Sequence, residues 1–341
     1  MLDPQGIYEV DEAAVARTLG AAYALGEPGA RPSGLLGERP GREIVVGQER
    51  GPEARRDDGP VMLHSMRGFV DAGSAGAIAV SHLVGELRTE RLVTFDVDQL
   101  LDYRSKRATM TFDNDRWVGY DTPELVIDHV TDAEGAGFLL LHGAEPDLQW
   151  ERVVAAVEQL VRRFGVSLVV GVHGIPIGVP HTRPMSLTAH ATRSGLIEDY
   201  TSWFGSVKVP GSLASLLEYR LGEAGHDALG FAMHVPNYLA QSQYPPAAVV
   251  ALQHIERTTG LALRVGALDE AAVDARIEVE QQVKESGEIA AVVKALEEQY
   301  DAFARSVGRP SLLAEAASMP TADELGAEFE RFLAQQDPQD S

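Results

Sequence analysis

The chain has 341 residues, of which 45% are hydrophobic and 23% charged, the composition of an ordinary globular protein rather than a disordered one. The absence of cysteine excludes a disulfide scaffold, a thiolate zinc site and a cysteine nucleophile. The 51 acidic against 29 basic side chains give a formal net charge of −22, which argues against nucleic acid and anionic membranes as partners. Because the sequence has neither a signal-peptide pattern nor a run of about 18 apolar residues, a cytoplasmic protein is expected.

The first 60 residues form the first predicted segment. The pattern over residues 9–25 predicts an amphipathic helix. Residues 26–60 contain eight glycines and five prolines, which indicates irregular structure, with 44–46 as the one candidate strand.

Residues 61–265 are the predicted core domain, in which apolar strands alternate with helices. The expected strands are 61–64, 92–97, 138–142, 166–172 and 229–235. One helix of small residues is expected to end near residue 87, and three more are expected at 147–164, 211–224 and 246–259. Residues 107–130 predict two or three short strands with a turn at Asp113-Asn114-Asp115. This alternation predicts an α/β fold with a mixed, twisted sheet flanked by helices.

Residues 266–341 form an acidic helical extension with 17 acidic and 6 basic side chains. Apolar residues recur there at helical spacing, with an interruption at Ser286-Gly287. Residues 321–324 fit a capping box for a last helix. We interpret the extension as a solvated appendage docked by an apolar stripe, and the alternative is a partner-binding arm.

The glycine-rich turn at residues 68–76 joins a strand to a helix. Asp71 and Gly73 lie where a helix N-terminus could hold an anion. The spacing matches neither a dinucleotide fingerprint nor a P-loop. Helix capping by Asp71 or Ser74 explains the same residue types and is the favoured interpretation.

The loop at residues 180–184 contains His181, Thr182 and Arg183 between two prolines. The arginine fork and the imidazole could together grip a carboxylate or phosphate. The equally weighted alternative is that Arg183 pairs with an acidic neighbour.

Residues 143–150 contain a further pair of carboxylates. Asp147 is the expected N-cap of the following helix. Glu145 is then left for acid–base chemistry or for pairing with Arg183.

Four histidines lie at or near the carboxyl ends of predicted strands: His64, His142, His173 and His234. If those strands are parallel, their rings could converge at the edge where α/β sheets bind ligands. The favoured alternative is that each is a hydrogen-bonded core residue. The sequence contains no zinc motif and no serine-hydrolase elbow, and we expect neither a metal nor a cofactor.

Four motifs occur together in order: residues 68–73, 145–150, 180–184 and 234–238. With them, residues 43–265 resemble the proteasome-assembly-chaperone-like family, second-subunit type, although Phe69-Val70 replace the more usual Trp-Asn. Residues 320–325 are similar to bacterial members with a C-terminal helical extension. The resemblance implies a fold similar to nucleoside phosphorylases, a homo-oligomer such as a trimer, and protein assembly without an established catalytic set. The ending Gln339-Asp340-Ser341 lacks the hydrophobic-Tyr-any pattern that docks family members on the proteasome.

The sequence therefore favours a non-enzymatic binding or assembly factor, whose candidate site comprises Asp71, Gly73, Glu145, His181, Thr182 and Arg183. This hypothesis predicts an apolar patch or oligomer interface near residues 26–60 or the tail helices. The alternative is a phosphorylase- or hydrolase-like enzyme, in which His181 and Arg183 hold an anion and Asp71 or Glu145 is the acid–base group. A small-anion sensor would share that pocket without turnover.

Overall fold

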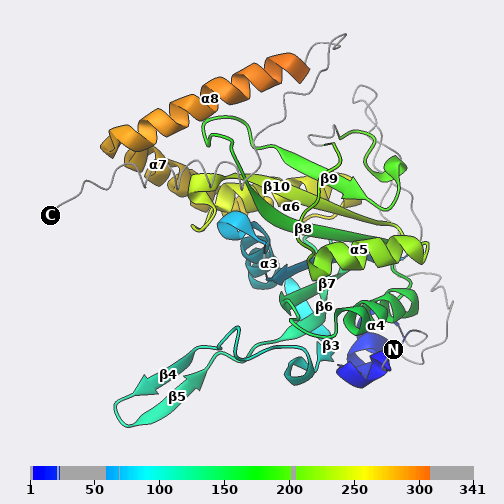
Figure 1. The fold of residues 1–341 in the computed structure, drawn as a ribbon. Coiled ribbons are helices and arrows are strands. Elements are labelled where there is room, and N and C mark those ends of the chain that lie inside the picture. Colours follow the sequence, from blue (N-terminus) through cyan, green and yellow to red (C-terminus); the bar gives the residue numbers. More distant parts are fainter. Residues whose placement is uncertain (1–2, 21–22, 24–58, 69, 201–204, 308–341) are drawn as a thin grey trace.

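The computed structural model describes residues 3–20, 23, 59–68, 70–200 and 205–307. Its centre is an eight-stranded sheet with the order β1-β3-β6-β7-β2-β8-β10-β9 (Figure 1). The strands are β1 (Tyr8–Val10), β2 (Val61–Arg67), β3 (Arg88–Phe95), β6 (Leu125–Thr131), β7 (Gly137–Ala144), β8 (Leu168–Ile177), β9 (Leu187–Ala191) and β10 (Ala228–Pro236). The four central strands β7, β2, β8 and β10 are parallel, and the others join antiparallel. The predicted mixed α/β sheet is confirmed.

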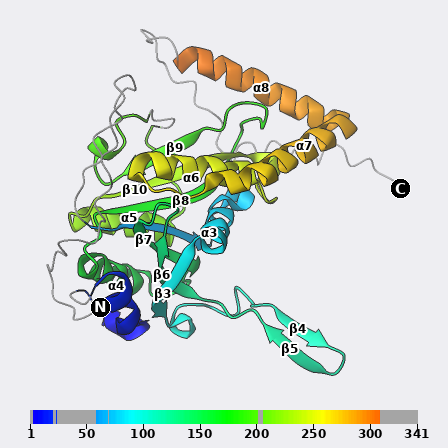
Figure 2. The ribbon, with the colours of Figure 1, turned by 180° about the vertical axis from the view of Figure 1, so that it is seen from behind.

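Helices cover both faces of the sheet, as Figures 1 and 2 show from opposite sides. The α-helices of the sandwich are α1 (Glu12–Thr18), α3 (Ala75–Glu86), α4 (Trp150–Arg163), α5 (Leu213–Glu223) and α6 (Pro245–Thr259). Short 3-10 helices are η1 (Pro4–Ile7), η2 (Ala72–Ser74), η3 (Val97–Gln99), η4 (Ser194–Leu196), η5 (Asn237–Leu239) and η6 (Val265–Leu268). One core packs under α3 and α6 and the other under α1, α4 and α5. Neighbouring residues Met62 and Leu63 belong to different cores, because side chains alternate along a strand.

Most expected elements are present, with different bounds. The N-terminal helix is shorter than predicted because residues 8–10 form β1, which pairs with β3 at the edge of the sheet. Strand β9 was not predicted. The candidate strand at 44–46 and the capping box at 321–324 lie outside the described residues. The division of the chain at residues 60 and 265 stays a prediction.

A separate two-stranded hairpin projects from the body (Figures 1 and 2). It consists of β4 (Met110–Asp113) and β5 (Arg116–Tyr120). Its turn contains the predicted Asp-Asn-Asp sequence, with Asn114 in the left-handed region at φ 52°. We call residues 110–120 the arm.

Two further helices, α7 (Asp269–Glu285) and α8 (Gly287–Val307), follow η6 and are separated at the predicted Ser286-Gly287 break. Helix α7 contributes Ala272 and Val279 to the core under α6. Helix α8 lies farther from the body (Figures 1 and 2) and buries Val293 to 5% exposure. In the described ranges, no helix combines the length and apolar character needed to cross a bilayer.

Candidate functional site

Asp71 caps helix α3 and ties it to the sheet. Its carboxylate accepts hydrogen bonds from the backbone N–H groups of Gly76 and Ala77, both at 2.9 Å, and of Gly174 at 3.0 Å. Ser74 occupies the N-cap position without a side-chain capping bond. The capping interpretation is therefore confirmed for Asp71, because three backbone donors already occupy its two oxygens.

Gly73 fastens the same turn to the segment after β10. Its N–H donates to Ala240 O and its carbonyl accepts from Tyr244 N, each at 2.8 Å. Its φ of +66° is in the region that favours glycine, and an added Cβ would lie 3.0 Å from Tyr244 Cβ. The glycine thus allows a close backbone approach within the protein.

Glu145 is buried at 6% exposure and caps helix α5: its Oε1 accepts from Leu213 N at 2.8 Å. Of the two alternatives for Glu145, pairing with Arg183 is not found, since Arg183 binds Asp301 and Glu297. Asp147 is not the N-cap of α4 as predicted. Gln149 takes that position, and the Asp147 carboxylate accepts from Asp102 N at 2.9 Å.

His181 is fixed to η5 by Tyr238. The Tyr238 hydroxyl accepts from His181 N at 2.9 Å and lies 2.7 Å from His181 Nδ1. Burial lowers the pKa of His181, although Glu280 and Glu297 oppose this. Burial also raises the pKa of Tyr238 to about 12. Burial therefore favours the uncharged form of both groups.

Arg183 holds helix α8. Its Nε and Nη2 donate to Asp301 Oδ1 and Oδ2 at 2.8 and 2.7 Å, and its Nη1 donates to Glu297 Oε1 at 3.1 Å. The Thr182 hydroxyl also donates to Glu297. Hydrogen bonding to Asp301 raises the pKa of Arg183, and the same bond lowers the pKa of Asp301. Pairing with an acidic neighbour, one of the two alternatives for Arg183, is thus confirmed.

The predicted residues therefore divide into two groups. Gly73 and His181 are both joined to the segment around η5, which brings the turn and the loop to the same edge of the sheet. Glu145 instead binds the start of α5. Within the part of the chain that the structure describes, no hydrogen bond or ion pair joins His181 or Arg183 to Asp71.

The four strand-end histidines do not share one site. His142 binds Asp128 at 2.8 Å. Both nitrogens of His234 bind hydroxyl groups, those of Ser186 at 2.9 Å and Thr188 at 2.8 Å. For these two rings the interpretation as hydrogen-bonded core residues is confirmed.

His64 and His173 lie instead near two residues that the sequence did not reveal, His190 of β9 and Glu218 of α5. The His190 and His173 ring centroids are 6.3 Å apart, and His190 Nδ1 lies 2.9 Å from Glu218 Oε1. Burial lowers the pKa of both His64 and His173 to about 4. No local signal pointed to His190, because β9 has no apolar run.

Two glycines make room for these rings. Register places His64, Gly171, Gly230 and His190 in one row across β2, β8, β10 and β9. A Cβ on Gly171 would lie 2.7 Å from His64 Cε1, and one on Gly230 would lie 2.2 Å from His190 Cε1. Among the described residues, however, no three His, Asp or Glu side chains are placed to hold a metal ion.

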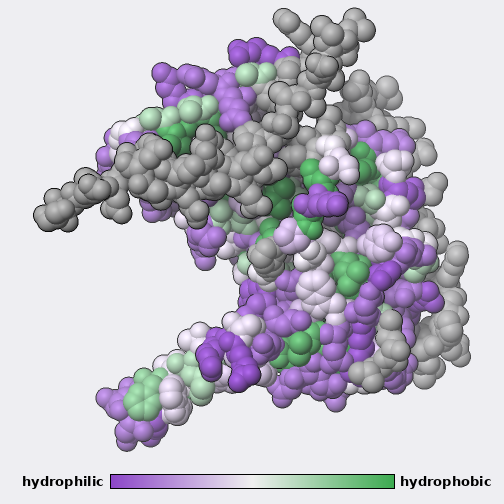
Figure 3. Space-filling view, viewed as in Figure 1, coloured by the Kyte–Doolittle hydropathy of each residue, from purple (hydrophilic) through white to green (hydrophobic). Residues whose placement is uncertain are grey.

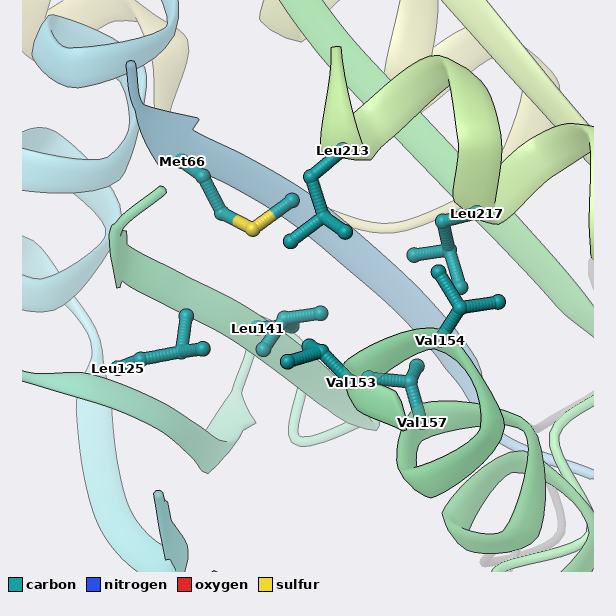
Figure 4. Close-up of a pocket in the computed structure, with 8 residues that line it drawn as sticks. All are labelled: Met66, Leu125, Leu141, Val153, Val154, Val157, Leu213 and Leu217. Atoms are coloured by element: carbon teal, nitrogen blue, oxygen red, sulfur yellow. The ribbon is translucent and has the colours of Figure 1, made fainter. Parts of the chain in front are cut away.

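Two cavities of the described structure lie away from these residues. The gap in Figure 4 lies between the sheet, α4 and α5, and leaves no volume for a water molecule. Its lining is entirely apolar: Met66, Leu125, Leu141, Val153, Val154, Val157, Leu213 and Leu217. A polar hollow of about 280 Å³ is lined by Arg17, Thr18, Arg88, Thr89, Glu90, His129 and Thr131. Neither contains a residue of the predicted site.

Known structures share this fold over most of the chain. A Mycobacterium tuberculosis protein of unknown function is 42% identical with a TM-score of 0.71, over 87% of this chain and 100% of the other. A Corynebacterium glutamicum protein of unknown function is 32% identical with a TM-score of 0.70, over 86% and 97%. A Mycobacterium tuberculosis homologue of proteasome-assembly chaperones shares the fold at 22% identity and a TM-score of 0.63, over 68% and 99%.

No curated protein matches the chain. The likeness to nucleoside phosphorylases stays a prediction. Residues 65–283 match the model of the PAC2 family, and these residues include the capped turn, the loop that holds α8 and the four parallel strands except for the first four residues of β2. This chain belongs to the PAC2 family.

Proposed function

We propose that the chain is a protein-binding assembly factor that acts in the cytoplasm as a homo-oligomer, such as a trimer, and binds without turnover. The observation that carries the proposal is the uncovered apolar face of the arm. The fold shared with a homologue of proteasome-assembly chaperones supports the assembly role. The partner beyond a second copy is left to experiment.

The arm carries paired apolar side chains on one face. Met110 pairs with Tyr120 and Phe112 with Trp117, and directly paired residues lie on the same face of an antiparallel ribbon. The Phe112 and Trp117 rings meet edge to face at 5.1 Å. All four side chains are about half exposed, from 48% for Tyr120 to 63% for Trp117. Figure 3 shows hydrophobic patches among hydrophilic residues on the projecting arm.

Such an arm gains stability from a covering surface. A single two-stranded hairpin is marginally stable in water. Arg104, Arg107 and Arg116, on or beside the arm, are exposed and form no ion pair within the described residues. Aromatic residues and arginine are the types most enriched at protein interfaces. The composition of the arm therefore fits a protein partner.

The sequence placed the expected apolar surface elsewhere. Val273, Ile277, Ile289 and Val292 of α7 and α8 are at least 39% exposed, which supports an apolar surface on the tail helices. The segment 26–60 lies outside the described residues. The arm itself was predicted only as short strands.

The contacts of Arg183 favour binding over the enzyme and anion-sensor alternatives. Both alternatives need a guanidinium that is available to a small anion. Here Asp301 and Glu297 occupy that group. Asp71 likewise has its carboxylate occupied by backbone donors, which leaves it poorly suited to acid–base work.

Sedimentation velocity of the purified full chain tests the proposal. The wild type should sediment as an oligomer, and Phe112→Ser with Trp117→Ser should weaken self-association at least tenfold, because the double change removes the centre of the apolar face. Thr111→Ala, on the opposite face of the same ribbon, is the matched control and should behave as wild type. A monomeric wild type, or a double variant that assembles normally, would contradict the proposal.

A further inference from the structure

The loop at residues 180–184, which we call the arginine loop, is fixed by contacts with η5. His181 is fixed to Tyr238 through both its backbone N–H and its ring, and the two rings pack edge to face at 5.9 Å. Pro180 is buried, and Pro184 restricts the other end. The guanidinium of Arg183 is therefore presented by a preorganised backbone, which lowers the cost of binding a ligand.

Helix α8 shows which ligand chemistry fits this loop. Glu297 and Asp301 are four residues apart, so their carboxylates lie on one face, one helical turn apart. Arg183 contacts both, and Thr182 donates to the first. On the same side, Val293 is buried. The loop thus binds a helix that has an apolar residue at position i and carboxylates at positions i+4 and i+8.

The ion pairs that hold the 21-residue helix α8 to the loop are partly exposed. The Arg183 and Asp301 side chains are 29% and 43% exposed, so water and salt reach this bidentate ion pair and screen it. Ile289 and Val292 face solvent at 39% and 45% exposure. The helix starts at Gly287, where an added Cβ would meet open space. A rigid loop therefore holds this helix through contacts that water and salt can reach.

We propose that the arginine loop is a docking site for an acidic amphipathic helix of a partner protein, and that α8 is the intramolecular occupant which this helix replaces. The inference rests on the proposed binding function and names the chemistry of its partner. Charge complementarity selects the partner, because Arg183 is the cation that both carboxylates of α8 share. Displacement of α8 would also expose more of its apolar side chains.

A labelled peptide with the sequence of residues 287–307 is the probe, and fluorescence anisotropy measures its binding to the full chain. In wild type, α8 competes with the peptide. Glu297→Gln with Asp301→Asn in the protein should loosen α8 and tighten peptide binding about tenfold. Adding Arg183→Ala should reverse this gain. Arg220→Ala, which removes an exposed arginine paired with Glu151 and Glu223, is the matched control and should leave binding unchanged.

Three results would overturn the inference: equal peptide affinity with and without the α8 changes, no effect of Arg183→Ala, or equal binding of a peptide in which both carboxylates are amides. A wild-type chain that forms dimers dependent on Arg183, Glu297 and Asp301 would show that the occupant is α8 of a second copy, which also rejects a separate partner helix. Self-association through the arm is measured by sedimentation velocity, so rejection of the arginine-loop inference would not reject the proposed function.

Discussion

Replacement of Asp71 separates a structural from a ligand-binding role for a residue that the sequence singled out. In Asp71→Ala, the N–H groups of Gly76, Ala77 and Gly174 lose their shared acceptor. The first two lie in the first turn of α3, and the third belongs to β8. The substitution therefore weakens both the helix start and its attachment to the sheet.

The expected loss follows from these bonds. A hydrogen bond to a charged group contributes about 1.5–3 kcal/mol, and loss of an N-cap costs about 0.5–2 kcal/mol. These contributions overlap, and water reaches part of the site, so we expect about 3 kcal/mol for Asp71→Ala. Asp71→Asn retains one acceptor oxygen and should lose roughly half as much.

Urea unfolding followed by circular dichroism measures both values. Asp115→Ala, an exposed aspartate in the turn of the arm, is the control and should change the free energy of unfolding by less than about 0.5 kcal/mol. A loss below that limit for Asp71→Ala would refute the capping argument. The anion-binding interpretation of the turn would then regain its support.

Two further predictions concern the row of histidines and glycines. Gly230→Ala should destabilise the fold by about 1–3 kcal/mol, because its Cβ would lie 2.2 Å from His190 Cε1. Gly85→Ala is the control and should not destabilise the fold, because open space surrounds Gly85. Equal urea midpoints for the two variants would contradict this prediction. Burial lowers the pKa of His64 to about 4, below its ordinary 6.5. Between these values the unfolded chain binds more protons than the folded chain, so the free energy of unfolding should decrease as the pH is lowered. We expect His64 to account for about 2 kcal/mol between pH 7 and 5, a dependence that His64→Gln should reduce; an unchanged pH profile would show that His64 is not the group that titrates.

The sheet could be predicted because its strands carry a direct physical signal. A strand covered on both faces, such as 138–142, must be apolar throughout, and a helix on such a sheet shows 3.6-residue periodicity. Strand β9 lies at the edge and is half exposed, so Leu-Thr-Ala-His-Ala contains no apolar run. The contact between His190 and Glu218 was hidden for the same reason.

The candidate site was harder to predict because its contacts join distant parts of the chain. Arg183 binds residues 114 and 118 positions away. The loop sequence shows that an arginine is available but not which of 51 acidic side chains it meets. The prediction that Asp147 caps α4 was wrong, because Gln149, with a φ of 59°, occupies the N-cap position. The alternation in the arm predicted strands but gave no indication of whether either face is covered.

Native mass spectrometry of the full chain, purified from its own cells, tests the central claim most directly. We predict a mass that is a multiple of the 36.7 kDa of one chain. The Phe112→Ser, Trp117→Ser variant should return to one chain. A wild type found only at the single-chain mass would contradict an account in which this protein works by holding other proteins.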